Sequence, residues 1–184
     1  MSDNTEVNYG PLAGLIGVWS GNKGTDLAPE PDGTETNEYY ETITFTEAGD
    51  VSNAEEQVIS AVHYMQKVQR ISNDKVIHQE TGYWMWEQDS NQVMHSLTIP
   101  RGMAVLAGGS FKEAENITFD VQASIDSKDW QLVQSPFMRE KAKLKEYVQQ
   151  LILGENSLSY TQTMVLDIYG RVFDHTDQNT LQRQ

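Results

Sequence analysis

The sequence predicts an all-β protein, an antiparallel up-and-down β-barrel of about ten strands with a short helical plug near its N-terminus. Short segments rich in β-branched and aromatic residues follow one another at hairpin spacing, and turn signals such as EAGD, SNDK, QDSN and LGEN separate them. Almost no helical pattern lies between these segments. The two observations together indicate an antiparallel meander that closes into a barrel.

The chain begins with a polar tail over residues 1–10, and the predicted plug follows it. Pro11 suits the first turn of a helix, and apolar side chains follow at helical spacing: Leu12, Leu15 and Ile16. Gly17 interrupts this pattern. We therefore expect a short turn of helix that ends where the first strand begins.

Trp19 stands among three glycines, Gly17, Gly21 and Gly24. Gly17 allows the backbone to turn from the plug into the first strand. Trp19 on that strand is expected to close the narrow end of the barrel with its large apolar ring. Gly21 and Gly24 allow the strand to bend at a corner. This segment therefore predicts architecture and carries no information about a ligand.

The segment 26–38, DLAPEPDGTETNE, combines two prolines, a glycine and several acidic residues. Such a composition is typical of a turn or loop. We therefore expect a long, exposed, acidic loop insertion between the first two strands.

Further strands are predicted over residues 39–48, 55–72, 75–88, 91–100, 103–111, 116–125, 145–153 and 157–168. The alternation is clearest in NITFDVQASI and SLSYTQTMVLDI, where apolar residues occupy every second position. Gln162 is the one polar residue on the inward face of the second segment. The segment 135–144, SPFMREKAKL, fits either a helical turn or an irregular lead into the next strand.

Composition limits the possible partners and compartments. The 184 residues fit a single domain over residues 1–184, and a formal net charge of −14 makes nucleic acid and anionic membrane surfaces unfavourable partners. The sequence has no cysteine, so any transition metal needs histidine, methionine, tyrosine or carboxylate ligands. Neither a signal peptide nor an apolar run of membrane-spanning length is present, and we expect a soluble, cytoplasmic protein.

The residues that carry chemistry are few. Hydrolase, P-loop and dinucleotide-binding motifs are absent from the sequence. The four histidines are the first metal-ligand candidates, although their spacing matches no zinc site: His63, His78, His95 and His175. The stretch ETGYWMWEQ and the hairpin after it supply aromatic and methionine side chains, which suit either a barrel core or a pocket for a flat ligand. Lipocalin-type and fatty-acid-binding-protein-like barrels of this size either fill with side chains or hold one apolar ligand.

Four stretches carry distinctive motifs in order along the chain. PLAGLIGVWSGNKG at residues 11–24 is close to P-L-x-x-L-x-G-x-W-x-G-x-G, with an Asn22-Lys23 pair in place of the usual acidic spacer, and YYETITF follows at residues 39–45. The longest, residues 77–111, begins IHQETGYW, close to M-H-x-E-[ST]-G-[FY]-[WF]. Residues 158–183 combine L-x-Y-x-x-x-M with a histidine about ten residues later. These stretches resemble the nitrobindin family, also described as the heme-binding domain of THAP-type proteins.

The resemblance implies a ten-stranded antiparallel barrel that holds heme b near its open end and binds ferric iron through one histidine. By position, it implies His175 as the axial ligand, His78 as the histidine near the pocket and Met164 as a residue that lines the heme. Ile77 takes the place of a family methionine. The resemblance also implies nitric oxide binding and isomerisation of peroxynitrite to nitrate. The acidic segment 26–38 replaces a short Pro-Thr segment of the family.

Two other functions remain open on the residues alone. The chain also suits a non-enzymatic binding protein, similar to fatty-acid-binding proteins or lipocalins, for a fatty acid or another small hydrophobic ligand. Alternatively, the methionine and aromatic side chains form a closed core, and the barrel serves as a structural or interaction protein. Hemin uptake favours the heme-binding barrel. Displacement of a fluorescent lipid probe without hemin uptake favours the binding protein for a hydrophobic ligand, and a barrel without a ligand-sized cavity favours the structural or interaction protein.

Overall fold

A computed structural model describes residues 6–184, so the first half of the predicted tail over residues 1–10 lies outside the described residues. The elements are η1 (Gly10–Leu15), β1 (Gly17–Glu30), β2 (Gly33–Asn53), β3 (Gln57–Arg70), β4 (Val76–Glu87), β5 (Gln92–Ile99), β6 (Met103–Glu113), β7 (Ile117–Ser124), β8 (Leu132–Gln134), α1 (Pro136–Lys141), β9 (Ala142–Leu153), β10 (Ser157–Ile168) and β11 (Arg171–Arg183). None of the helices in the described part of the chain is long and apolar enough to cross a membrane.

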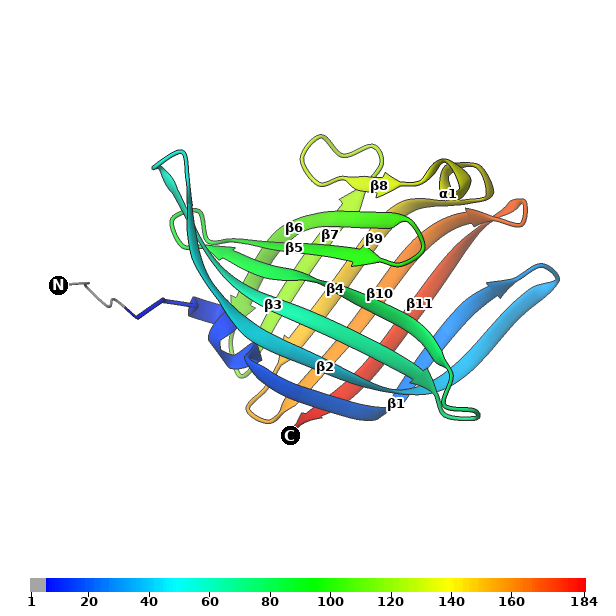
Figure 1. The fold of residues 1–184 in the computed structure, drawn as a ribbon, viewed down its shortest axis with the longest axis horizontal. Coiled ribbons are helices and arrows are strands. Elements are labelled where there is room, and N and C mark those ends of the chain that lie inside the picture. The colour runs from blue at the N-terminus through cyan, green and yellow to red at the C-terminus, as the bar shows by residue number, and fades with distance from the viewer. Residues whose placement is uncertain (1–5) are drawn as a thin grey trace.

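Ten strands close into an antiparallel barrel (Figure 1). Around the ring they follow the order β1-β2-β3-β4-β5-β6-β7-β9-β10-β11, and pairing of β11 with β1 closes it. β8 is an additional short strand that pairs with the start of β6. The predicted fold class is therefore confirmed.

The predicted plug is a 3₁₀ helix, η1, at the end of the barrel that holds the C-terminus (Figure 1). Trp19 is fully buried beside it, and the indole Nε1 donates a hydrogen bond of 2.7 Å to the carbonyl of Leu15. The Arg183 guanidinium lies 4.3 Å from the centre of the Trp19 ring and donates to the carbonyl of Ile16 at 2.8 Å. Gly17 has a φ of +131°, a backbone conformation that favours glycine. Trp19 thus closes this end, as the sequence predicts.

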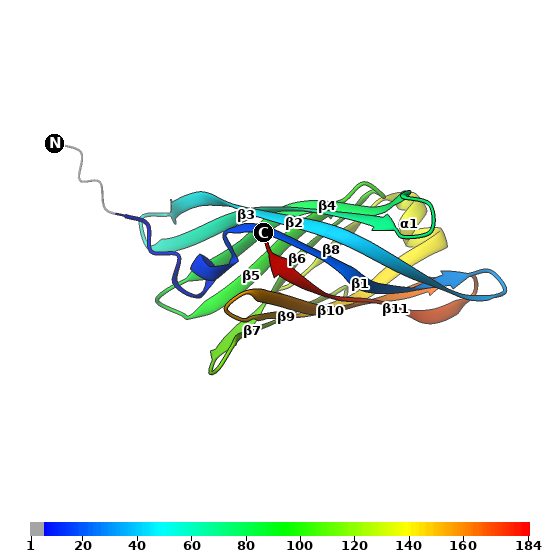
Figure 2. The ribbon, with the colours of Figure 1, turned by 90° about the horizontal axis from the view of Figure 1, so that it is seen from below.

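The acidic segment 26–38 is not a loop, and that prediction was wrong. Its two halves belong to β1 and β2, which pair in register up to Glu30 and Gly33. The segment projects past the barrel near the β10–β11 turn, at the end away from the plug (Figure 2). The last register pair of β1 with β11 is Leu27 with Thr176, so Pro29 lies where β1 has no second neighbour, and Pro31 lies in the turn that follows. Proline is tolerated at such an edge because no ladder partner needs its N–H.

The segment 135–144 contains a helical turn, α1, which begins after Ser135 and leads into β9. The Ser135 hydroxyl accepts a hydrogen bond of 3.3 Å from the amide of Met138, a side-chain N-cap. β8, which precedes this helix, has no counterpart among the predicted strands. With three residues, it is too short to produce a detectable alternation.

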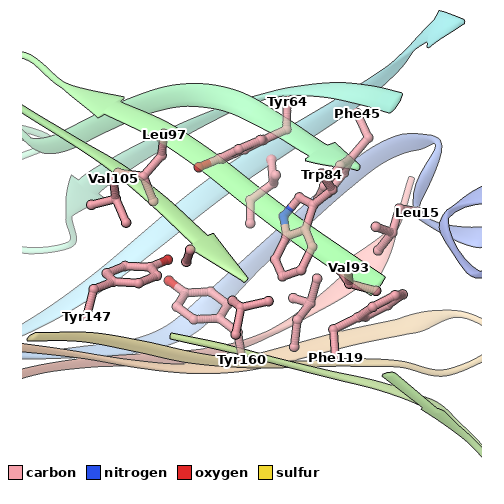
Figure 3. Packing of buried hydrophobic residues seen from close by; sticks show 14 of the residues in the cluster. Leu15, Phe45, Tyr64, Trp84, Val93, Leu97, Val105, Phe119, Tyr147 and Tyr160 are labelled. Atoms are coloured by element: carbon pink, nitrogen blue, oxygen red, sulfur yellow. The ribbon is translucent and has the colours of Figure 1, made fainter. Parts of the chain in front are cut away.

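The predicted alternation is correct in β7 and β10. Inward positions of β7 are buried from Phe119 onward, and every second residue of β10 from Leu158 to Leu166 is buried. Figure 3 shows side chains from facing strands, among them Trp84, Phe119 and Tyr147, pointing into the same interior. Apolar side chains therefore fill the half of the barrel next to the plug.

Candidate functional site

A pocket of about 280 Å³ lies at the end of the barrel opposite the plug. It is bounded by the β1–β2 hairpin, the adjoining ends of β3 and β4, the turn after β5, and parts of β10 and β11. The charged lining residues separate by sign. Acidic residues come from β1, β2 and β11, and basic residues come from β3, β4 and the neighbouring turns: Asp26, Glu35 and Asp177 against Arg70, Lys75, His78 and Arg101.

The acidic wall is organised around His175. Asp26 on β1 and Asp177 on β11 are directly opposite cross-strand partners, so both carboxylates point to the same face. The Nε2 atom of His175 lies 2.8 Å from Oδ1 of Asp26 and 3.8 Å from Oδ2 of Asp177. Asn37 donates a hydrogen bond of 3.0 Å to the other oxygen of Asp26 and thereby fixes that carboxylate.

The protonation of this cluster follows from burial and from its mutual charges. Burial alone lowers the pKa of His175, but the hydrogen bond to Asp26 and the two nearby carboxylates raise it above its ordinary value. Burial raises the pKa of Asp26, and the hydrogen bond and charge of His175 reverse that effect and lower it. Burial raises the pKa of Asp177 to about 6. A protonated His175 paired with an ionised Asp26 is therefore the favoured state near neutral pH.

The basic wall carries an unsatisfied donor. Arg70 on β3 pairs at 3.5 Å with Glu35 on the neighbouring strand β2, and within residues 6–184 no acceptor lies within hydrogen-bond distance of the buried Nε of Arg70. Arg101 donates a hydrogen bond of 3.3 Å to the carbonyl of Ile77, which holds the β5–β6 turn against β4. A buried donor without a partner costs free energy, so this wall favours an anionic or carbonyl group of a ligand.

His78 is held by a buried carboxylate. Its Nε2 atom lies 3.0 Å from Oε2 of Glu80, which is only 2% exposed. Burial lowers the pKa of His78, but the hydrogen bond and charge of Glu80 raise it above its ordinary value. Burial raises the pKa of Glu80, and His78 outweighs this effect and lowers it. The raised pKa favours the protonated form of His78, which adds positive charge to the pocket wall.

A hydrogen-bonded chain continues from Glu80 into the barrel. The Tyr64 hydroxyl donates to Glu80 at 2.6 Å and lies 2.9 Å from Nε2 of His95, and Nδ1 of His95 lies 3.3 Å from the Tyr147 hydroxyl. Burial lowers the pKa of His95 to about 4, so this histidine is neutral. Because the Tyr64 hydroxyl gives its one proton to Glu80, the consistent assignment is that Nε2 of His95 donates to Tyr64, whereas the Tyr147 hydroxyl donates at 3.0 Å to the amide oxygen of Gln149. Tyr147 also lies 3.1 Å from the amide oxygen of Gln162, a pocket residue.

The structure brings three of the four residues singled out from the family resemblance to one pocket. His175, His78 and Ile77 line it, and His175 on β11 is separated from His78 on β4 by β1, β2 and β3 around the ring. Met164 is buried on β10 as the direct cross-strand partner of His175, but it belongs to the apolar core and not to the pocket lining. His95 is also buried in the core, where its ring stacks on the indole ring of Trp84.

The remaining site residues were not found from the sequence. Asp26, Asp177 and Arg70 meet only because β1 lies beside β11 and because β3 ends at the same mouth. Glu80 follows His78 with the spacing of a strand face, and this i, i+2 relationship was the one available signal. A closed barrel with a polar, histidine-lined pocket at one end defines a class of small-molecule-binding β-barrels.

Comparisons with known proteins identify the family. A family model described as a THAP4-like, heme-binding beta-barrel domain matches residues 8–183, so the chain belongs to this family and the resemblance to nitrobindins is confirmed. The chain is similar to a solved structure, the crystal structure of Rv2717c from M. tuberculosis, with a TM-score of 0.73 and 20% identity over 97% of this chain and 99% of that chain. At that identity the likeness establishes the fold alone. Curated proteins gave no match.

Heme is the cofactor of the family, and the pocket residues fit it with one condition. An imidazole from His175, apolar contacts from Val68 and Ile77, and a cationic wall for carboxylate groups all face the same space. The unsatisfied Nε of Arg70 matches a carboxylate acceptor. The condition concerns His175, because its Nε2 atom lies 2.8 Å from Oδ1 of Asp26. Ligation through Nε2 therefore requires the side chain of Asp26 or His175 to move.

Proposed function

We propose that the barrel holds heme b in this pocket, with His175 as the axial ligand of ferric iron and His78 and Ile77 on a separate wall. The supporting observation is the presence of both histidines in one pocket whose basic wall has an unsatisfied donor. Met164 lies beside His175 on the neighbouring strand as its direct cross-strand partner, in the core next to the pocket. When bound, heme would supply an iron centre that takes small ligands.

The residues of this chain would bind, orient and shield that group. His175 must give up its proton and its contact with Asp26 before Nε2 can act as a ligand. Arg70, Lys75 and Arg101 are placed to pair with the carboxylates of heme. Glu80 holds the imidazole of His78 by its Nε2 atom in the wall of the pocket.

We further propose that the bound form takes nitric oxide and isomerises peroxynitrite to nitrate, as the family resemblance implies. Peroxynitrite is an anion, and the protein as a whole repels anions because its net charge is −14. The basic wall offsets this repulsion locally, and a protonated His78 is within the pocket to donate a hydrogen bond to an anionic oxygen. Enzymatic turnover is therefore assigned to the same pocket, with His78 as the orienting donor.

Binding of a fatty acid is the second candidate. The orphaned Nε of Arg70 would donate a hydrogen bond to the carboxylate of any amphipathic acid as well as to that of heme. Against it, large side chains fill the interior beyond the pocket, including Trp84, Phe119 and Tyr147. A long acyl chain therefore has no apolar channel to enter, and the geometry favours a ligand held at the mouth.

Titration of the purified protein with hemin tests the proposed function. We expect a Soret band that saturates at one heme per chain, a lost or strongly shifted band in His175→Ala, and partial recovery when free imidazole is added to that variant. His63→Ala is the matched control, because His63 lies on β3 outside the pocket and contacts Thr81. An unchanged spectrum in His175→Ala removes this residue as the ligand, and displacement of a fluorescent fatty acid without hemin uptake selects the second candidate.

Peroxynitrite turnover is tested separately on the heme-loaded protein. The rate of peroxynitrite decay and the yield of nitrate are compared between the wild type and His78→Ala. We expect a rate at least tenfold lower in the variant, with hemin affinity changed by less than that factor, since one well-placed donor contributes about 1.4 kcal/mol or more. Equal rates would remove His78 from the reaction while leaving heme binding intact.

A further inference from the structure

The carboxylates of Asp26 and Asp177 face one another across β1 and β11 as direct register partners. Like charges in this position destabilise a strand pair. A single protonated His175 balances only one of the two charges when both carboxylates are ionised. The barrel thus concentrates negative charge around the imidazole nitrogen of His175. All three residues lie on paired strands, so the strand register fixes their positions.

The three donor atoms converge closely. One nitrogen of His175 and one oxygen from each of Asp26 and Asp177 all lie within 4.8 Å of one another. A tetrahedral or octahedral site with bonds of about 2.0–2.2 Å needs donor atoms about 3 Å apart, so small side-chain rotations are sufficient. We infer that Asp26, His175 and Asp177 form a binding site for a divalent transition metal ion such as Zn²⁺ or Co²⁺ in the heme-free protein.

The surroundings of the cluster match those of a metal site. Asn37 donates to the second oxygen of Asp26 at 3.0 Å and also to Glu35 at 3.1 Å, which orients the first carboxylate from behind. The cluster forms part of the pocket wall, so water or a small anion has access to the remaining coordination positions. Two carboxylates and a neutral imidazole balance the charge of a divalent ion.

The donor set defines the class of ion. One imidazole nitrogen and two carboxylate oxygens suit Zn²⁺, Co²⁺ and related first-row ions, whereas Mg²⁺ and Ca²⁺ prefer oxygen ligands alone. The same nitrogen of His175 is the proposed axial ligand of heme iron. Competition between the divalent ion and heme therefore rests on the proposed function, while the metal site itself does not.

The test titrates heme-free protein with Co²⁺, followed by visible absorption, and with Zn²⁺, followed by calorimetry. We expect one ion per chain, with binding abolished in His175→Ala and weakened at least tenfold in Asp177→Asn and in Asp26→Asn. Asp32→Asn is the matched control, since Asp32 lies in the turn of the same acidic hairpin and outside the pocket. We expect it to bind Zn²⁺ within twofold of the wild type, and Mg²⁺ to bind the wild type at least a hundredfold more weakly.

Absence of binding, or equal losses in Asp32→Asn and Asp177→Asn, overturns the inference, because equal losses indicate diffuse attraction to the acidic hairpin. Far-ultraviolet circular dichroism confirms that each variant is folded, and the two Asn variants test the site independently. Hemin titration of the wild type separates this result from the proposed function. Uptake of hemin without uptake of Zn²⁺ refutes the metal site alone, and uptake of Zn²⁺ without hemin refutes heme binding alone.

Discussion

Oδ1 of Asp26 lies 2.8 Å from Nε2 of His175 and links the β1–β2 hairpin to β11 at the mouth of the pocket. Both side chains are partly buried, with exposures of 12% and 26%. This contact holds the imidazole in its protonated form and occupies the nitrogen that binds iron in the proposed function. In the proposed function, the acidic hairpin would therefore limit how readily Nε2 of His175 can bind iron.

Asp26→Asn is expected to increase hemin affinity. The amide keeps the size of the side chain but removes the negative charge that stabilises the imidazolium. Loss of an ion pair of this exposure corresponds to about 1 kcal/mol, or roughly a fivefold to tenfold lower Kd for hemin at pH 7. Titration of the Soret band measures the change, and Glu30→Gln near the hairpin tip is the control. Weaker hemin binding in Asp26→Asn would mean that the carboxylate orients the ligand histidine and does not compete for it.

Glu80→Gln is expected to release His78. The ionised Glu80 raises the pKa of His78 above its ordinary value, and a neutral amide removes both the charge and the strong hydrogen bond. Burial then dominates, so the pKa of His78 falls below its ordinary value. Nuclear magnetic resonance titration of the histidine ring protons follows this change directly. Glu87→Gln, a change at a half-buried residue of the same strand at the plug end, should leave the His78 titration unaltered. An equal shift there would contradict the assignment.

Much of the barrel could be predicted from local sequence patterns. In strands such as β7 and β10, the inward face appears in the sequence as apolar residues at every second position. The acidic hairpin could not be predicted in this way, because its prolines and glycine are typical of loops, and only the strand edge beyond Leu27 explains why they are tolerated. The residues of the candidate site also divide into those that local motifs predict and those that only the folded structure brings together. His175 and His78 were identified from motifs, whereas Asp26 and Arg70 contribute through ring closure between segments far apart in the sequence.

Two buried residues are expected to give opposite pH dependences of stability. Burial raises the pKa of Glu41 from its ordinary 4.5 to about 7, and burial lowers that of His95 from 6.5 to about 4. The raised pKa of Glu41 contributes stability at low pH that is lost as pH rises from about 4.5 to 7. The lowered pKa of His95 contributes stability at high pH that is lost as pH falls from about 6.5 to 4. Between about pH 4.5 and 6.5 the two contributions cancel.

Single variants expose each contribution. In Glu41→Gln the free energy of unfolding, relative to the wild type, rises by about 1.4 kcal/mol per pH unit between pH 4.5 and 6.5, and in His95→Gln it falls by a similar amount. Urea denaturation at pH 4.5, 5.5 and 6.5 measures both slopes. The double variant should regain the wild-type pH dependence. Parallel pH profiles in the wild type and both single variants would show that neither group has a shifted pKa.

Gly24→Ala is expected to destabilise the barrel and disturb the pocket. A Cβ atom at Gly24 would lie 2.1 Å from a ring carbon of Tyr39, whereas a Cβ at Gly33 of the neighbouring strand meets no atom within 4 Å. Tyr39 is 1% exposed, lines the pocket and lies 2.7 Å from the Tyr160 hydroxyl, so it cannot move without breaking that contact. Overpacking of this kind costs about 1–3 kcal/mol.

Gly33→Ala is the matched control, because it adds the same methyl group where space is free and leaves stability equal or about 0.4–1 kcal/mol higher. Urea denaturation measures the difference between the two variants. Displacement of Tyr39 also predicts weaker hemin binding in Gly24→Ala, since the ring forms part of the pocket wall. If both variants were equally stable, the bend of β1 between Gly21 and Gly24 would not depend on close approach to Tyr39. A stable Gly24→Ala variant with unchanged hemin affinity would also show that this ring does not shape the pocket.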